Sequence, residues 1–159
     1  MTATSATAAY LRVSSTSQDA GSQRTAIERC AAARGEVVTE WFSEKRSAKT
    51  LARPELNRLL AAVRMGTVKR LYTFKLDRLC RSGVGDTFRV VEEIRRSCEL
   101  VAVGDNLTIK PNKDDIASEV FVFALGLAAK LERLAWEERR AAARDRLTSA
   151  GRPWGRPPR

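Results

Sequence analysis

Two groups of side chains in this sequence have the types and placement needed for chemistry on a phosphate. Ser14 and Arg12 end one short apolar run, and residues 75–81, which contain several cations, follow another. Arg53 lies between these two groups in the sequence. Guanidinium groups stay charged and bind phosphate oxygens bidentately, and a serine hydroxyl can attack the phosphorus. We interpret these residues as a serine nucleophile with arginines that bind the phosphate under attack.

The residue types that are missing narrow the chemistry further. The sequence has no histidine, which removes Ser-His-Asp and Cys-His catalysis and most catalytic zinc sites. It has no GxxxxGK phosphate loop and no cluster of metal ligands, so we expect no metal and no cofactor. Cys30, Cys80 and Cys98 are widely spaced and are interpreted as reduced thiols. Cys80 is an alternative nucleophile, but without a histidine to activate it a packing role is favoured.

The charge balance favours a polyanionic partner. The chain has 159 residues, with 29 Lys and Arg against 19 Asp and Glu, a net charge of +10 and a pI near 10.3. Double-stranded DNA is therefore the leading partner class, and a solvated basic surface is the alternative. The sequence begins without a signal peptide, and its longest apolar run, residues 120–129, is far shorter than a membrane span. We expect a cytoplasmic protein with no membrane contact.

The elements that must position the candidate nucleophile and arginines alternate along the chain. Apolar runs predict strands at residues 8–13, 37–42, 71–74 and 100–103, and amphipathic patterns predict helices at residues 18–33, 54–65 and 84–98. This alternation predicts an α/β fold, a layered domain with a central, largely parallel sheet flanked by helices. Ligands bind beyond the carboxyl ends of such strands. Because Ser14 and the predicted loops 43–52 and 75–82 all follow strand ends, we expect them to converge.

A long C-terminal helix is predicted after this sheet. Residues 114–148 contain no strong helix breaker except Gly126, and the apolar residues of the first half recur at helical spacing: Ile116, Val120, Phe123, Leu127, Leu131 and Leu134. The second half is rich in arginine. We expect an oligomer interface that leads into a DNA contact, and the alternative is a core helix with a solvated end. Trp41 and Trp136 are expected to be core or interface anchors.

Three segments follow from these patterns. Residues 1–112 form the α/β core, residues 113–148 form the long helix, and residues 149–159 form a basic Gly/Pro linker or minor-groove arm that carries Arg152 and Arg156. We expect a separate DNA-reading domain to be absent from this chain.

Four motifs, in order, resemble the resolvase/invertase family of serine site-specific recombinases, in its N-terminal catalytic domain. They are Tyr10-Leu11-Arg12-Val13-Ser14 with Gln18 and Gln23, then Arg53-Pro54-Glu55-Leu56, then Leu76-Asp77-Arg78-Leu79-Cys80-Arg81, and finally Glu132-Arg133 with Glu138-Arg139. The resemblance runs from about residue 8 to residue 156.

The resemblance implies a role for each matching residue. Ser14 would form a 5′-phosphoserine link to DNA, the phosphate would be bound by Arg12, Arg53, Arg78 and Arg81, and Asp77 and Gln23 would orient these groups. DNA binding or subunit contact would fall to Tyr10, Gln18, Lys75, Arg133, Glu138, Arg139, Arg144, Arg152 and Arg156. Family members bind as homodimers, synapse as tetramers, and cut and rejoin DNA without metal or ATP.

The sequence departs from the family pattern at a few positions. Ser15 stands where threonine is usual and is a rival nucleophile, although strand geometry directs it to the side opposite Ser14. Glu44 replaces an aspartate, Ser47-Ala48 replaces a Ser-Gly pair, and Cys80 replaces a glycine. Two other functions stay open: a non-catalytic DNA-binding or assembly protein with this fold, and a metal-dependent nuclease, which the lack of a carboxylate cluster disfavours.

Overall fold

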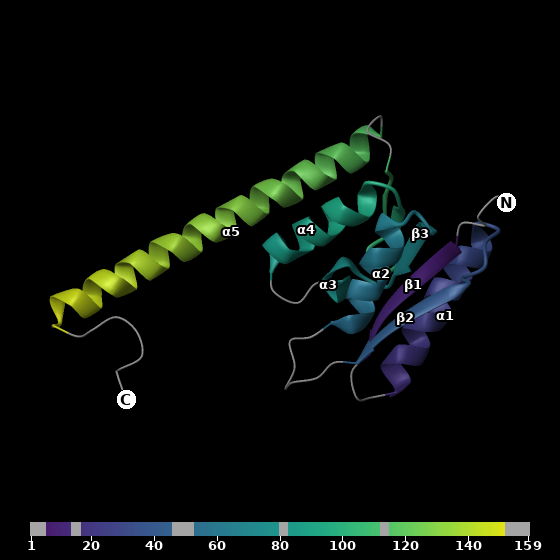
Figure 1. Cartoon of the computed structure of the whole chain (residues 1–159), viewed down its shortest axis with the longest axis horizontal. Helices are drawn as coiled ribbons and strands as arrows, with labels where there is room; N and C mark the ends of the chain where they lie inside the picture. Colours follow the sequence, from purple (N-terminus) through teal and green to yellow (C-terminus); the bar gives the residue numbers. More distant parts are fainter. Residues whose placement is uncertain (1–5, 14–16, 46–52, 80–82, 112–114, 152–159) are drawn as a thin grey trace.

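The structure is a computed structural model and describes residues 6–13, 17–45, 53–79, 83–111 and 115–151. Its elements, in chain order, are β1 (Ala6–Val13), α1 (Ser17–Ala33), β2 (Glu40–Lys45), α2 (Pro54–Arg64), β3 (Val68–Thr73), α3 (Leu76–Leu79), α4 (Val84–Arg95), β4 (Glu99–Ala102), β5 (Leu107–Ile109) and α5 (Ile116–Ser149). Figure 1 shows α5 running alongside α4 and continuing well past the rest of the domain.

The sheet confirms the predicted class. Its strand order is β2-β1-β3-β4-β5, the first four strands are parallel, and β5 is antiparallel to β4. Because β1 lies between β2 and β3, the carboxyl ends of these three strands meet at one edge of the sheet. The end of β1 is therefore the centre of that edge.

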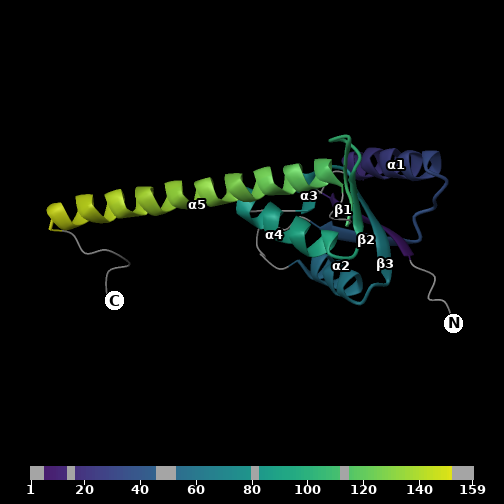
Figure 2. The same cartoon turned by 90° about the horizontal axis from the view of Figure 1, so that it is seen from above.

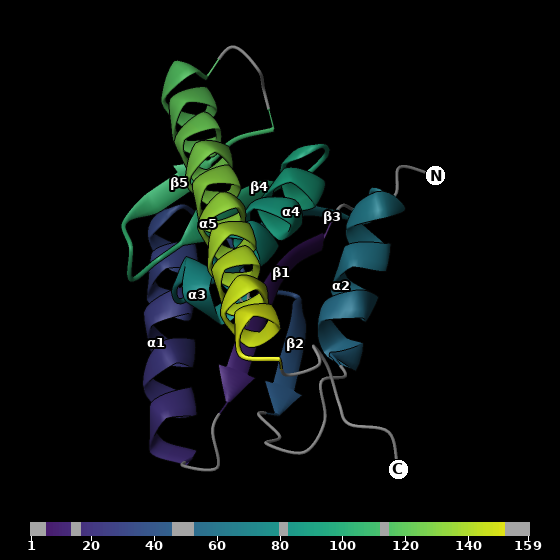
Figure 3. The same cartoon turned by 90° about the vertical axis from the view of Figure 1, so that its left-hand side faces the viewer.

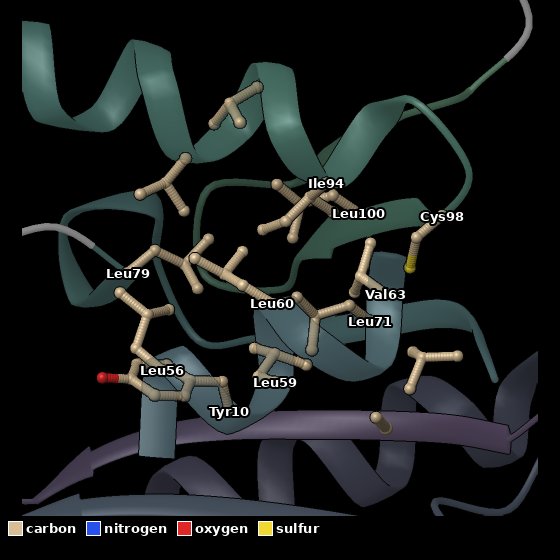
Figure 4. Packing of buried hydrophobic residues seen from close by; sticks show 14 of the residues in the cluster. Tyr10, Leu56, Leu59, Leu60, Val63, Leu71, Leu79, Ile94, Cys98 and Leu100 are labelled. Carbon is tan, nitrogen blue, oxygen red and sulfur yellow. The ribbon is translucent and has the colours of Figure 1, made fainter. Parts of the chain in front are cut away.

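Helices cover both faces of the sheet, as Figure 3 shows for α1 on one side and α2 on the other. Alternate residues of β1 serve the two faces, because side chains along a strand point in opposite directions. Ala9 and Leu11 pack with Ile27 and Ala31 of α1. Ala8 and Tyr10 belong to the larger core with α2, α4 and the start of α5. Figure 4 shows this larger core, in which the leucines of α2 lie against Tyr10 and Leu71.

Local sequence explains where α2 begins and ends. Pro54 occupies the first turn, where its missing N–H removes no helical hydrogen bond. The buried carboxylate of Glu44 accepts hydrogen bonds from the backbone N–H groups of Glu55 and Leu56, at 3.0 and 3.2 Å. Gly66, with φ of 71°, ends the helix in a conformation that glycine adopts without strain. Glu44 thus fixes the helix start that follows Arg53.

Three sequence predictions for this region were wrong. The second strand begins at Glu40 and includes Ser43 to Lys45, which were expected in a loop, whereas Val37 is 77% exposed and lies outside the strand. The segment expected to be a loop from residue 75 contains α3. Strand β5 was not predicted, since only three residues form it and they depend on pairing with β4.

Helix α5 has two apolar faces with different environments. Val122 is buried, and Phe121 and Leu125 pack against the core beside it. The predicted apolar stripe instead lies open: Ile116 (75% exposed), Val120 (61%), Phe123 (73%), Leu127 (49%), Leu131 (58%) and Leu134 (41%). The interpretation of this stripe as part of an intramolecular core is therefore wrong. Figure 2, seen from above, shows the far half of α5 extending away from the sheet.

The two tryptophans, Trp41 and Trp136, also differ in how exposed they are. The Trp41 ring is half-buried, with the guanidinium of Arg24 4.3 Å from its centroid. Trp136 is 57% exposed, so it is not a core anchor of this chain. No helix in the described segments combines the length and apolar content needed to cross a bilayer.

Candidate active site

Three of the predicted phosphate-binding arginines come from separate elements at the carboxyl edge of the sheet. Arg12 is the penultimate residue of β1, Arg53 directly precedes α2, and Arg78 lies in α3, which follows β3. The edge position follows from the parallel pairing of β1 with β3. The structure therefore brings together side chains that are far apart in the sequence.

Arg78 and Arg53 lie near enough to Arg12 for their charges to affect its pKa. The pKa of Arg12 is lowered from its ordinary value, first because partial burial disfavours the charged form, and then because the positive charges of Arg78 and Arg53 act on it. Tyr10 and Asp77 oppose this shift. An anion bound among the three guanidinium groups would relieve the mutual repulsion.

Arg53 is held by several partners at once. Its Nη2 donates to the hydroxyl of Tyr10 at 3.3 Å and to the carbonyl oxygen of Leu79, and its Nη1 lies 3.7 Å from the carboxylate of Asp86. Tyr10 is completely buried, and burial raises the pKa of its hydroxyl, although Arg53 lowers it. Tyr10 was predicted to contact DNA or a subunit, and in this structure its hydroxyl reaches the site through Arg53.

Arg78 and its neighbours form the outer part of the cluster. The Nε of Arg78 is buried without a hydrogen-bond partner among the described residues, and it lies 3.9 Å from the carboxylate of Asp77. Lys75 and Asp77 are exposed. A surface hollow of about 490 Å³ opens here, lined by Arg12, Leu76, Asp77, Gly83, Val84, Thr87 and Leu125. Arg12 and Asp77 thus face a space large enough for a phosphodiester group.

Gln23 is an unusual feature of α1. Its side chain is 1% exposed, and neither amide atom has a hydrogen-bond partner among the described residues. Buried polar groups nearly always find a partner, so this amide is available for one. Gln18 lies in the first turn of α1, but its side chain falls outside the described part of the structure.

Several predicted residues cannot be placed. The described segments do not include Ser14, its rival Ser15, Arg81, Cys80, or the tail residues Arg152 and Arg156. In the sequence, Ser14 directly follows Val13, the last residue of β1. Its role as the nucleophile stays a prediction.

The predicted residues of the long helix all lie on α5, and Arg133 lines a surface hollow together with Asp86. The structure places Arg133, Glu138, Arg139 and Arg144 on the exposed surface of α5. Arg133 pairs with Glu137 one turn along the helix, at 3.8 Å. Their predicted contacts with DNA or another subunit are not tested by one isolated chain.

Three acidic residues contact the arginine cluster or the helix starts next to it, and none of them had a role predicted from the sequence. Glu44 anchors the start of α2, Asp86 pairs with Arg53, and Glu132 reaches from α5 to the start of α4. Glu44 had a usable signal, because an acidic residue that precedes a proline-led helix can cap it. Asp86 had none, since its partner Arg53 is 33 residues away. Glu132 stood in the fourth motif without a role, with its partner Val84 48 residues away. Within the described segments, no three Cys, Asp or Glu side chains are grouped to hold a metal ion.

Comparisons with known proteins agree with this architecture. Residues 7–153 match the family model described as Resolvase, N terminal domain. The N-terminal catalytic domain of TP901-1 integrase is 25% identical, with a TM-score of 0.65 over 81% of this chain and 97% of its own. A resolvase family site-specific recombinase from Streptococcus pneumoniae is 18% identical, with a TM-score of 0.72 over 90% of this chain and 99% of its own. A search of curated proteins found no match.

Proposed function

This chain belongs to the resolvase family of serine recombinases, and we propose that it cuts and rejoins double-stranded DNA through a phosphoserine on Ser14. The observation that carries the proposal is the meeting of Arg12, Arg53 and Arg78 at the edge where β1 ends, one residue before Ser14. Fixed guanidinium groups can stabilise the charge that develops on a phosphate without any change of protonation. A binding protein would have no need of a hydroxyl nucleophile beside them.

The proposed reaction conserves one phosphodiester bond at each step. The Ser14 Oγ attacks the phosphorus, loses its proton, and forms a 5′-phosphoserine bond while the bond to the 3′ oxygen breaks and that oxygen leaves as a 3′ hydroxyl. Rejoining reverses the step, when a 3′ hydroxyl attacks the phosphoserine and frees the serine. Because the bond energy is kept in the intermediate, the cycle requires no ATP. Arginine supplies the charge that a metal ion supplies in other phosphoryl transfer enzymes.

Self-association is the second part of the proposal. The stripe from Ile116 to Leu134 exposes six large apolar side chains on one face of α5. A contiguous apolar surface of this kind is typical of an interface. We place a homodimer on this stripe, with a tetramer as the synaptic complex. The arginine-rich end of α5 and the tail at residues 149–159 would contact the DNA backbone and the minor groove.

A covalent adduct tests the catalytic proposal. A pool of nicked duplexes with randomised sequence, labelled at the 3′ ends, is incubated with the protein and analysed on a denaturing gel. We expect labelled protein from the native chain and from Ser15→Ala, and none from Ser14→Ala. An adduct that persists in Ser14→Ala would assign the nucleophile elsewhere. A native chain that shifts the same duplexes without forming an adduct would favour the non-catalytic DNA-binding function.

The stripe is tested separately by light scattering. Leu127→Glu places a charge within the stripe, and we expect the native dimer to become a monomer. Ala128→Glu adds the same charge on an exposed part of α5 outside the stripe and is expected to leave the dimer intact. A native chain that stays monomeric at high concentration, with and without DNA, would overturn this part of the proposal.

A further inference from the structure

The first turn of α4 receives its cap from another helix. The Oε2 of Glu132, on α5, accepts hydrogen bonds from the backbone N–H groups of Val84 at 3.0 Å and Gly85 at 3.4 Å. These N–H groups have no partner within their own helix, and the residue before the helix, Gly83, offers no side chain to cap it. A carboxylate is also favoured at a helix N-terminus by the helix dipole. Glu132 therefore fixes the start of α4 to α5.

The fit between the two helices is close at this point. Gly83 has φ of 84°, and a Cβ at that position would come within 2.6 Å of Oε1 of Glu132. Six residues before Glu132, a Cβ on Gly126 would lie 2.9 Å from Cε2 of Phe88 on α4. Glycine at both positions allows α5 to approach this closely. Because of these close contacts, a change in the position of α5 would also change the position of the first turn of α4.

The same turn of α4 also contacts the arginine cluster. Asp86 pairs with Nη1 of Arg53 at 3.7 Å, and both side chains are mostly buried, at 19% and 13% exposed. Arg53 also donates to the carbonyl oxygen of Leu79. Arg53 therefore contacts the protein on both sides of residues 80–82, the segment that contains Arg81 in the sequence. Glu132 and Arg53 thus both contact the first turn of α4.

We propose that Glu132 is a positioning residue that holds the first turn of α4 and, through Asp86, sets the place of Arg53 for the scissile phosphate. The position of α5, the helix that we propose makes the subunit and DNA contacts, then determines whether the arginine cluster has the geometry needed for cleavage. This inference rests on the proposed function for its consequence in DNA cleavage. The contact chain from Glu132 to Arg53 can be tested without DNA.

The test compares three variants of the full chain. Glu132→Ala removes the cap, whereas Glu132→Gln keeps an amide oxygen that can accept from Val84. Glu119→Ala is the matched control, because Glu119 also joins α5 to α4, through Arg95 at 2.8 Å, but at the other end of α4. Two readouts are recorded: the rate of adduct formation over a range of DNA concentrations, and the NMR signal of the Arg53 Nε–H group, assigned with Arg53→Lys.

In Glu132→Ala we expect the adduct rate at saturating DNA to fall about tenfold to a hundredfold, as for a reacting group that is misplaced by about 1 Å. The DNA concentration for half-maximal rate should change much less. Glu132→Gln should restore the rate to within about threefold of the native value. A small loss should remain, because a neutral acceptor is weaker than a charged one. The Arg53 signal should shift or broaden in Glu132→Ala and stay in place in Glu119→Ala.

Two results would overturn the inference: an Arg53 signal unchanged in Glu132→Ala, or equal losses of rate in Glu132→Ala and Glu119→Ala with no rescue by glutamine. If the native chain forms no adduct, the proposed function fails, and the NMR comparison still decides whether Glu132 positions Arg53.

Discussion

The positive charge of arginine is balanced by carboxylates at different distances at the two ends of the parallel sheet. At the amino ends of the strands, Arg70 and Arg34 lie 2.7 and 3.1 Å from the carboxylate of Glu99. Glu36 also pairs with Arg70 and accepts a hydrogen bond from Tyr72. At the carboxyl ends, the ion pairs of Arg53 and Arg78 are longer, 3.7 Å to Asp86 and 3.9 Å to Asp77.

This difference separates arginines with close carboxylate partners from the arginines that we propose bind a phosphate. Where each guanidinium has a close carboxylate, the charges are balanced within the chain. At the carboxyl edge, the carboxylates that pair with Arg53 and Arg78 are more distant, and Arg12 has its pKa lowered first by partial burial and then by the other two arginines. Because Coulomb attraction weakens with distance, the longer pairs compensate less of this positive charge. The remaining attraction is available to an anion.

The largest effect should come from Arg78→Ala at the carboxyl edge. Loss of one guanidinium that stabilises the transition state should lower the adduct rate by about a hundredfold to a thousandfold. Arg78→Lys should recover only part of the rate, because an ammonium group cannot bind two phosphate oxygens in a fixed plane. The rate is measured on the randomised nicked duplexes. A native rate in Arg78→Ala would remove Arg78 from the proposed site.

The second effect is a loss of stability when an arginine at the amino ends of the strands is removed. Arg70→Ala leaves Glu36 and Glu99 without their closest shared cation, so the free energy of unfolding should fall by about 1–3 kcal/mol. Urea denaturation measures this change. The adduct rate under native conditions should stay near the native value. A large loss of rate with no loss of stability would reverse the comparison between the two ends.

The smallest effect is the response to a simple anion. Sulfate should bind the carboxyl-edge arginines and stabilise the native chain by about 1.4 kcal/mol at ten times its dissociation constant, which raises the Tm by about 3–6 °C. The Tm is measured in sulfate and in chloride at equal ionic strength. Arg78→Ala should show a smaller sulfate response than Arg34→Ala, and both variants share the general salt effect. Equal responses would show that sulfate does not distinguish the two ends.

Much of the fold follows from patterns that lie within single segments. The apolar run of β1 and the spaced leucines of α2 are local signals, and both elements formed as predicted. Strand β2 started later than its valines suggested because its register is set by β1, which pairs Ala8 with Glu40 and Val13 with Lys45. Strand β5 has three residues and depends on β4 for its hydrogen bonds. Pairing across the sheet is tertiary information.

The candidate site shows the same limit. The convergence of Arg12, Arg53 and Arg78 was expected because each follows or neighbours a predicted strand end, and the structure places them together. Their catalytic roles and that of Ser14 stay predictions. Asp86 and Glu132 were given no role because an acidic residue on a helix usually faces solvent, and the packing of α4 against α5 gives Glu132 its partners.

Helix α5 approaches α4 closely at Gly126, near the core, so a small change in helix angle at this point would be amplified along the rest of α5. From Gly126 to Ser149 the helix extends about 34 Å, so a tilt of about 10° at Gly126 would move its far end by about 6 Å. Phosphates along one DNA strand advance about 3.4 Å per base pair along the axis. A methyl group at residue 126 that tilted α5 by this amount would therefore shift the basic end of the helix by more than one base pair. The smallest side chain on the helix sets the register at which its arginines meet DNA in the proposed complex.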